Sequence, residues 1–198
     1  MVERKRELRA VALSRRASLS PSESCRLSRQ IQERAVQWPR YRDCAAVALY
    51  RAVQNEVATD TLREHAMATG KQVFYPRTAR EGTLEFVRVE ADEPWTVGWG
   101  GVPEPTGSVR LTAAPDRFVV FVPGVAFDVR GGRLGRGKGG YDRFLAALGS
   151  QATVVGLAYE FQIVDEVPTE TWDQRVDFIV TESRLICCRD RRQQLSLS

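Results

Sequence analysis

A buried strand, a glycine-rich loop and a helix follow one another in residues 118–145, and this order constrains the fold more than any other feature. Phe118 to Val122 is a continuous apolar run of β-branched and aromatic residues, which is typical of a fully buried strand. Pro123 and Gly124 end the run, and a helical pattern begins at Tyr141. The loop between strand and helix therefore lies where an α/β protein would present it to a ligand.

The rest of the chain alternates in the same way. We predict helices over residues 2–18, 21–38 and 60–69, and further strands at 44–50, 71–75, 84–89, 152–159, 176–180 and 185–188. Strands alternating with helices predict an α/β fold with a largely parallel central sheet covered on both faces. The 198 residues suit a single domain, residues 1–198, with a frayed tail at 189–198.

Glycine occupies six of the ten positions from Gly131 to Gly140, and Arg133, Arg136 and Lys138 stand among these glycines. Glycine can adopt positive φ and turn several backbone amides towards one point. These amides, the positive end of the following helix and three fixed cations suit a polyphosphate better than a neutral ligand.

Two general motifs overlap this loop. Gly132, Gly137 and Lys138 satisfy GxxxxGK, but Gly139 stands where a P-loop has the Ser or Thr that holds magnesium. A second set satisfies GxGxxG, with an acidic residue twenty positions on, as in a nicotinamide-binding Rossmann enzyme: Gly135, Gly137, Gly140 and Glu160. A Rossmann turn follows its strand directly, whereas twelve residues separate Val122 from Gly135. A flexible surface loop is the remaining alternative.

The composition excludes several classes of function. The one histidine, His65, makes histidine triads implausible, and the four cysteines show no CxxC pair, which fits a reducing compartment and a cytoplasmic protein. No apolar run reaches 18 residues, so no membrane partner is expected. The net charge is +4 and the arginines are scattered rather than grouped in a stripe, so no nucleic-acid partner is expected either.

Other segments carry candidate ligand contacts. Glu56 follows a predicted strand, at the edge where α/β folds bind ligands, although it also suits a capping acid for the next helix. The segment 91–115 is rich in Pro, Gly and Trp and long for a structureless loop. Trp95 is expected to anchor this loop, and Trp99 is either an anchor or a stacking wall for a flat ligand.

Three blocks in order identify a family resemblance: FVPGVAFD, GGRLGRGKGGYDRFL and PTETWDQRVDFIVTE. Together with KRELR, LYRAVQNEVAT and VPEP, they resemble the 5-formyltetrahydrofolate cyclo-ligase family over nearly the full length. The resemblance implies a three-layer α/β/α sandwich. It also implies ring closure of 5-formyltetrahydrofolate to 5,10-methenyltetrahydrofolate by an enzyme that uses ATP and Mg²⁺. Separately from the resemblance, we expect a monomer and a substrate with or without a polyglutamate tail.

The resemblance also implies site residues. Lys5 and Arg9, on the N-terminal helix within residues 1–18, resemble nucleotide contacts, although spacing alone equally suits two solvated charges. The phosphate loop would comprise Arg133, Leu134, Gly135, Arg136, Gly137, Lys138, Gly139, Gly140 and Tyr141, with Arg136, Lys138 and Tyr141 as its catalytic members. Asp142 and Asp173 match magnesium ligands, although the first also suits a helix-terminal acid and the second a surface acid. Glu56 and Arg51 match folate contacts.

One departure from the family pattern concerns the folate. The family commonly has two aromatic residues before the aspartate Asp142, and Gly140 replaces the first of them. Packing against the folate would then come from Trp99 or Phe127. The departure leaves open a relative that binds folate or nucleotide without closing the ring.

Overall fold

The computed structural model describes residues 1–79 and 83–188, so the predicted frayed tail lies outside the described residues. Seven strands form the central sheet in the order β12-β11-β9-β6-β1-β2-β3. Their bounds are β1 Ala46–Ala48, β2 Gln72–Thr78, β3 Leu84–Val89, β6 Phe118–Val122, β9 Ala152–Leu157, β11 Phe178–Val180 and β12 Leu185–Cys187. Every neighbouring pair is parallel except β2–β3 and β11–β12 at the two edges. The predicted parallel sheet is confirmed.

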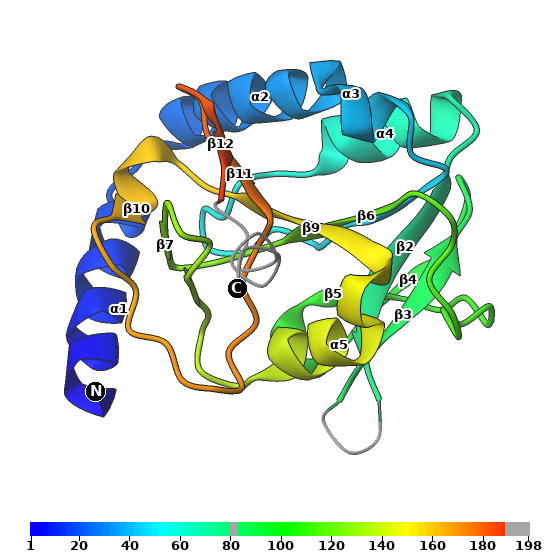
Figure 1. The fold of residues 1–198 in the computed structure, drawn as a ribbon. Helices are drawn as coiled ribbons and strands as arrows, with labels where there is room; N and C mark the ends of the chain where they lie inside the picture. Colours follow the sequence, from blue (N-terminus) through cyan, green and yellow to red (C-terminus); the bar gives the residue numbers. More distant parts are fainter. Residues whose placement is uncertain (80–82, 189–198) are drawn as a thin grey trace, which may run out of the picture.

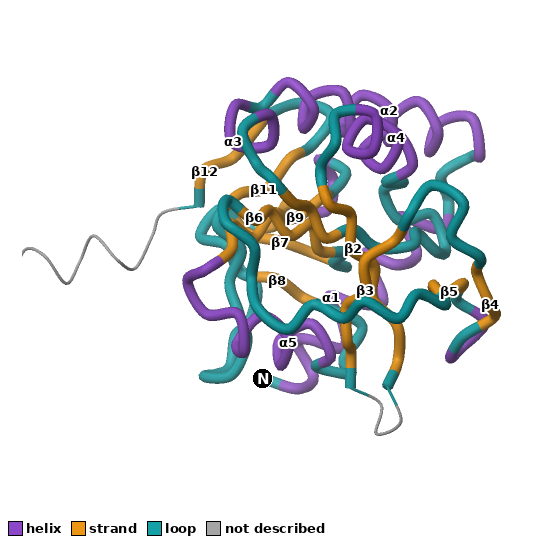
Figure 2. Tube along the Cα trace, turned by 90° about the vertical axis from the view of Figure 1, so that its right-hand side faces the viewer, coloured by secondary structure: helices purple, strands orange, loops and turns teal. Residues whose placement is uncertain are grey.

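Helices cover both faces of this sheet. One layer contains α2, α3 and α4, and α5 lies on the opposite side (Figures 1 and 2). The helix α1 runs beside the sheet and contacts the short strand β7. The helix bounds are α1 Val2–Ala17, α2 Pro21–Gln37, α3 Pro39–Arg42, α4 Asp60–Ala68 and α5 Gly140–Leu148. The arrangement is the expected three-layer α/β/α sandwich.

Alternate side chains along each strand point to opposite faces of the sheet, so the hydrophobic core has one part on each face. In β1, Val47 belongs to the cluster that contains residues of α2 and α4, whereas Ala46 and Ala48 belong to the cluster that contains Leu145 of α5. Side chains alternate across a strand, so a strand with apolar residues at every position can bury both faces. The continuous apolar runs in the sequence are the result.

Two smaller sheets complete the fold. One consists of β10, β7 and β8, and the other is the β4–β5 hairpin. The bounds of these strands are β4 Trp95–Val97, β5 Pro103–Pro105, β7 Ala126–Asp128, β8 Arg133–Leu134 and β10 Ile163–Val164. Short 3₁₀ helices span η1 Trp99–Gly101, η2 Gly149–Gln151 and η3 Glu160–Gln162. Residues 91–115 are therefore not a structureless loop, since a hairpin occupies their middle.

The strand β2 is longer than the sequence predicts. It continues through Pro76 to Thr78 and pairs with β3, where Pro76 lies opposite Phe86. Its pairing with β1 reaches only Phe74, so the missing amide hydrogen of Pro76 breaks no bond to that neighbour. The prediction that Pro76 ends the strand is wrong for this reason.

The strand order creates a ligand-binding edge. From β1 the chain passes to β2 and β3 on one side and returns to β6 on the other, so the direction of winding reverses between β1 and β6. Open α/β sheets bind ligands at such a point, outside the carboxyl ends of the strands. The segments that leave β1 and β6 there begin with Leu49 and Pro123.

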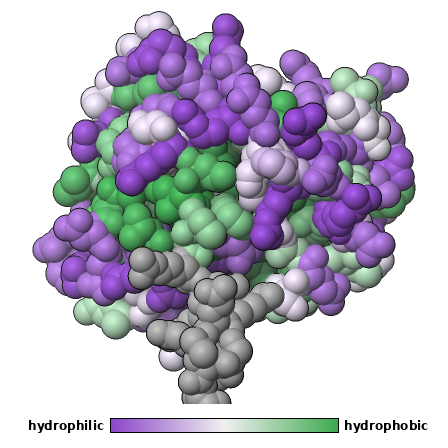
Figure 3. Space-filling model, turned by 45° about the horizontal axis from the view of Figure 1, so that its top comes forward, coloured by the Kyte–Doolittle hydropathy of each residue, from purple (hydrophilic) through white to green (hydrophobic). Residues whose placement is uncertain are grey.

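Within the described residues, no helix is long and apolar enough to cross a membrane. Hydrophilic residues predominate on the face that carries α2 and α4, as the space-filling view in Figure 3 shows. The helices therefore direct their apolar residues to the sheet and their polar residues outward.

Candidate active site

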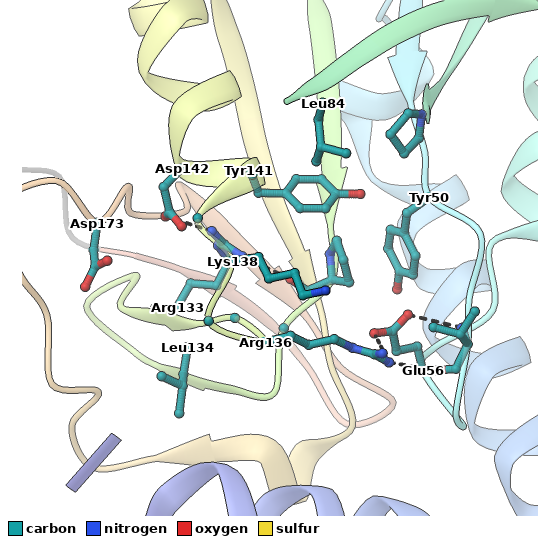
Figure 4. A pocket seen from close by; sticks show the side chains of 18 of the residues that line it. Tyr50, Glu56, Leu84, Arg133, Leu134, Arg136, Lys138, Tyr141, Asp142 and Asp173 are labelled. Carbon is teal, nitrogen blue, oxygen red and sulfur yellow. Dashed lines mark hydrogen bonds and ion pairs between the residues drawn. The ribbon is translucent and has the colours of Figure 1, made fainter. Parts of the chain in front are cut away.

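A cavity of about 750 Å³ opens at the carboxyl edge of the sheet (Figure 4). Its walls come from segments that are distant in the sequence. They are α1 (Val2, Lys5, Arg9), the segment after β1 (Tyr50, Arg51, Val53, Glu56), β2 and β3 (Pro76, Thr78, Leu84), residues 102–104, Pro123, Gly124, residues 133–142, Glu170, Trp172 and Asp173.

A buried carboxylate holds the base of the glycine-rich loop. Asp128, 1% exposed, accepts hydrogen bonds from the amides of Arg130 and Gly132 at 2.9 and 3.0 Å and from Val167 N at 2.8 Å. These bonds close the turn between β7 and β8, in which Gly131 has φ +84°. The loop therefore leaves β8 on a fixed support.

Two glycines in the loop require positive φ. Gly137 has φ +95°, and Gly139, which caps α5, has φ +65°. Backbone in this region is unfavourable for residues with a Cβ. The loop thus lines the cavity up to the N-terminus of a nine-residue helix, the end of a helix that favours anions.

The three loop cations face different groups. Arg133 is bound to Asp142, with Nη2 at 2.8 Å from Oδ1, and its guanidinium lies over the Tyr141 ring. Arg136 Nη2 donates to Glu56 Oε1 at 3.0 Å. Lys138 points into the cavity between Tyr141 and Arg136 (Figure 4).

Helix α1 closes one side of the cavity through Lys5 and Arg9. Lys5 Nζ lies 2.7 Å from Asp173 Oδ2 and 3.0 Å from Glu170 Oε2, and Arg9 Nε donates to the carbonyl oxygen of Gly135 at 2.9 Å. Burial alone lowers the pKa of Lys5, but hydrogen bonds and charges of the two carboxylates outweigh burial and raise it. Burial alone raises the pKa of Asp173, but bonds from Lys5 and the Glu170 amide lower it. Lys5 and Asp173 are therefore both ionised.

The two predicted magnesium ligands line the same cavity. Asp142 Oδ1 accepts hydrogen bonds from Arg133 at 2.8 Å and from the Gln174 amide at 3.1 Å. Asp173 Oδ2 accepts hydrogen bonds from Lys5 at 2.7 Å and from the Glu170 amide at 2.8 Å. The second oxygen of each carboxylate takes part in none of these contacts. Among residues 1–79 and 83–188, no three His, Cys, Asp or Glu side chains form a metal cage. Magnesium commonly takes one or two carboxylates together with phosphate oxygens and waters, so the pair fits a metal held jointly with a nucleotide.

Glu56 stands at the opposite wall with two tyrosines nearby. Its side chain is 8% exposed, and Val53 N donates to Oε2 at 3.1 Å. Burial, followed by the charge of Glu56, raises the pKa of both Tyr50 and Tyr141 above the ordinary tyrosine value. Tyr141 therefore stays protonated, so it can donate a hydrogen bond but cannot act as a base.

The two aromatic residues expected to pack against the folate are Phe127 and Trp99. Phe127 is fully buried in the core cluster of the α5 face and does not line the cavity, because its ring fills the space above Gly124 and Gly156. The contact assigned to Phe127 is therefore wrong. The side chain of Trp99 lies outside the described part of the structure. Trp95 packs edge-on against Tyr75 at 5.1 Å, as an anchor would.

The dinucleotide interpretation is also wrong for this chain. Its acidic residue, Glu160, pairs with Arg184 at 2.7 Å and accepts a bond from Thr181 at 2.6 Å, and it does not line the cavity. The loop follows β8 of the small sheet rather than a strand of the parallel sheet.

Sequence reasoning missed part of the wall. Leu84 of β3 lies where a side chain at position 140 would extend, since a Cβ on Gly140 would come within 3.1 Å of it. An aliphatic residue thus flanks the position where the family has an aromatic. Trp172 lines the cavity and is 64% exposed. It lies next to Asp173 in a segment with no periodic pattern, so only its proximity to that aspartate could have indicated it.

Comparison with known proteins decides the family. A model of the 5-formyltetrahydrofolate cyclo-ligase family matches residues 1–182. The chain belongs to this family. It is therefore an enzyme, a ligase that forms a carbon–nitrogen bond, and the resemblance read from its sequence is confirmed.

Individual cyclo-ligases agree in sequence and in fold. The probable 5-formyltetrahydrofolate cyclo-ligase of Schizosaccharomyces pombe is 33% identical, covering 92% of this chain and 97% of its own. The Escherichia coli K12 enzyme is 31% identical over 86% and 96% of the two chains. The NMR structure of Aquifex aeolicus 5,10-methenyltetrahydrofolate synthetase superposes with a TM-score of 0.82 at 35% identity, covering 94% of this chain and 93% of its own.

Proposed function

We propose that the protein converts 5-formyltetrahydrofolate, with or without a polyglutamate tail, to 5,10-methenyltetrahydrofolate, using ATP and Mg²⁺ and releasing ADP and phosphate. The observation that carries this proposal is the placing of the cationic glycine-rich loop and Glu56 on facing walls of one cavity. A cationic surface suited to phosphates and a carboxylate suited to a pterin thus line the same cavity.

The reaction requires that the formyl oxygen become a leaving group. Transfer of a phosphoryl group to this oxygen achieves that, after which N10 attacks the formyl carbon, the C–O bond breaks and N10 loses its proton. Phosphoryl transfer is catalysed mainly by alignment and by stabilisation of charge on the transferred oxygens. We assign this role to the loop amides, Arg136 and Lys138, and the binding of the outer phosphates to Lys5 and Arg9.

Asp142 and Asp173 would hold the metal together with phosphate oxygens. Mg²⁺ bound there would supply positive charge against the phosphates. Arg133 holds Asp142 in place through the 2.8 Å bond, and Lys5 does the same for Asp173. Both carboxylates are thereby oriented before a nucleotide arrives.

The folate is assigned to the wall formed by Glu56, Arg51, Leu84 and Tyr141. The Glu56 carboxylate can accept hydrogen bonds from the amino-pyrimidinone edge of a pterin or offset positive charge on N5. Tyr141, which stays protonated, can donate a hydrogen bond towards the formyl group. The apolar side chain of Leu84 would pack against the ring where the family has its aromatic.

We place the protein in the cytoplasm as a single-domain monomer without nucleic-acid partners. All four cysteines are free thiols, which suits a reducing compartment.

The decisive test is an assay of ring closure. Purified protein, 5-formyltetrahydrofolate, ATP and Mg²⁺ are mixed, and the near-ultraviolet absorbance of the methenyl product is followed. Absorbance that rises only when all components are present supports the proposal. Folate binding without product would instead identify a diverged binding relative.

A further inference from the structure

An arginine that is buried behind the cavity wall has no role in the function proposed above. Arg16, near the end of α1, is 1% exposed and does not line the cavity. Its Nη1 donates to Gly124 O at a long 3.4 Å. Within the described part of the chain, its Nε and Nη2 have no hydrogen-bond acceptor.

Burying a guanidinium in this way is costly. Removal from water lowers the pKa of Arg16, and the charge of Arg136 adds to the effect, while Glu56 opposes it. An arginine stays charged in proteins, so its burial must be offset by a nearby anion. Glu56 is that anion, with Oε1 at 3.9 Å from Nη2.

Glu56 is shared between two arginines. The same oxygen, Oε1, lies 3.0 Å from Arg136 and 3.9 Å from Arg16. The side chain of Arg136 is 39% exposed and belongs to the loop assigned to the phosphates, whereas Arg16 is buried and fixed. A phosphate would draw Arg136 away from Glu56, because an arginine binds phosphate oxygens strongly and in bidentate fashion.

The backbone at Arg16 also holds the segment that carries Glu56. Gln54 and Asn55 have φ +51° and +58°, an unfavourable conformation for residues other than glycine. The Asn55 side chain donates to the carbonyl oxygens of Arg16 and Leu19, each at 3.2 Å. The end of α1 thus fixes both the backbone and the charge of this segment.

We propose that Arg16 is a positioning residue, which takes over the Glu56 carboxylate when Arg136 turns to the nucleotide and keeps it directed at the folate. The two nitrogens of Arg16 without an acceptor, Nε and Nη2, are the donors that would then bind the Glu56 carboxylate. This inference rests on the proposed function, because it assigns the folate to Glu56 and the phosphates to Arg136.

The test compares folate affinity with and without nucleotide. Binding of 5-formyltetrahydrofolate to wild type, Arg16→Met and Arg16→Lys is measured by calorimetry, alone and with a non-hydrolysable ATP analogue and Mg²⁺. Without the analogue, Arg136 still holds Glu56, so Arg16→Met should weaken binding less than about threefold. With the analogue the loss should reach about tenfold, equivalent to about 1.4 kcal/mol. Arg16→Lys should recover part of it.

A neighbouring arginine and a double variant serve as controls. Arg15 is exposed on the same helix, and Arg15→Met should leave both affinities unchanged. In a Glu56→Gln background, Arg16→Met should have no further effect, since Arg16 acts through Glu56. If Arg16→Met does not fold, Arg16→Lys alone should show a smaller loss that still depends on the analogue.

An equal loss with and without the analogue, or none, would overturn the inference while leaving the proposed function intact. Failure of the wild type to bind the folate would refute the proposed function instead.

Steady-state kinetics provides an independent test. The KM for 5-formyltetrahydrofolate should rise about tenfold in Arg16→Met, while the KM for ATP changes less than about threefold, a split that general loosening of the fold would not produce.

Discussion

Lys138 projects into the cavity from a loop that is otherwise mostly glycine and arginine. Lys138 and Arg136 are exposed, and the hydrophobic core clusters contain neither of them. Removal of one such cation should change catalysis much more than stability, because no core packing is lost.

We expect Lys138→Ala to lower kcat by about 10²–10³-fold, the range seen when one group that stabilises transition-state charge is deleted. Single-turnover measurement of methenyl product checks this, together with thermal unfolding. Lys71, which bonds to the carbonyl oxygens of Arg42 and Cys44 outside the cavity, provides the control Lys71→Ala. A near-normal single-turnover rate in Lys138→Ala would remove this lysine from the mechanism.

We expect Asp142→Asn to raise the magnesium concentration needed for half-maximal activity, because an amide oxygen binds Mg²⁺ more weakly than a carboxylate. Calorimetric titration of Mg²⁺ into the ADP complex measures the same loss without turnover. Asp116, exposed and outside the cavity, provides the control Asp116→Asn. Unchanged titrations in both experiments would argue against metal ligation at Asp142.

At the scale of elements, the ring of Phe127 in β7 packs against Gly156 of β9 and against Gly124 in the turn between β6 and β7. The Phe127 ring fills the space that a Cβ on Gly156 or Gly124 would occupy. These contacts join the small sheet, which supports the glycine-rich loop, to the central sheet. The packing of Phe127 thus supports the site without contact to a ligand.

Gly156→Ala should lower the free energy of unfolding by about 1–3 kcal/mol, because the new methyl group would lie 2.5 Å from a carbon of the Phe127 ring. Denaturant unfolding measures the change. The double variant Gly156→Ala/Phe127→Leu should be more stable than the sum of the two single changes predicts, since the smaller side chain leaves room. Additive losses would show that the two residues do not compete for space.

At the scale of the molecule, the cavity depends on contacts between distant segments. The ion pair between Lys5 and Asp173 joins α1 to a loop 168 residues later, with side chains only 11% and 17% exposed. Arg9 adds a bond from the same helix to Gly135. Helix α1 is therefore part of the site and not an appendage to it.

We expect Lys5→Met to lower the free energy of unfolding at pH 7 by about 1–3 kcal/mol, less than the loss of one partner from a fully buried pair. The pKa of Lys5 is raised, so its contribution is complete below its ordinary value of 10.5 and disappears as the pH rises through the raised pKa. The pKa of Asp173 is lowered, so its contribution is present above its ordinary value of 3.8 and disappears at lower pH. The difference between wild type and variant should thus be largest between these limits.

Thermal unfolding of the ligand-free protein at a series of pH values provides the measurement. Arg6→Met provides the control. Arg6 pairs with Glu3 on the same helix, and the two side chains are 76% and 61% exposed, so this variant should change stability little at any pH. A difference for Lys5→Met that does not shrink above pH 10.5 would show that lost packing, not charge, is responsible.

The sequence by itself determined the class of fold and the position of the glycine-rich loop. Apolar runs that bury both faces of a strand and a glycine-rich stretch are local signals, because they depend on residues close together in the sequence. Residues at the carboxyl ends of strands were predictable too, since Glu56 and the glycine-rich loop meet at the expected edge.

Only the tertiary structure decided which side chains share a space. Phe127 and Trp172 are both aromatic residues near family motifs, yet one is buried in the core and the other lies exposed at the cavity. Lys5 and Asp173 form an ion pair although they lie 168 positions apart in the sequence. Arg16 and Glu56 also form an ion pair, between helix α1 and the segment after β1. Such contacts depend on how the helices pack against the sheet, and no local pattern in the sequence shows which distant side chains this packing brings together.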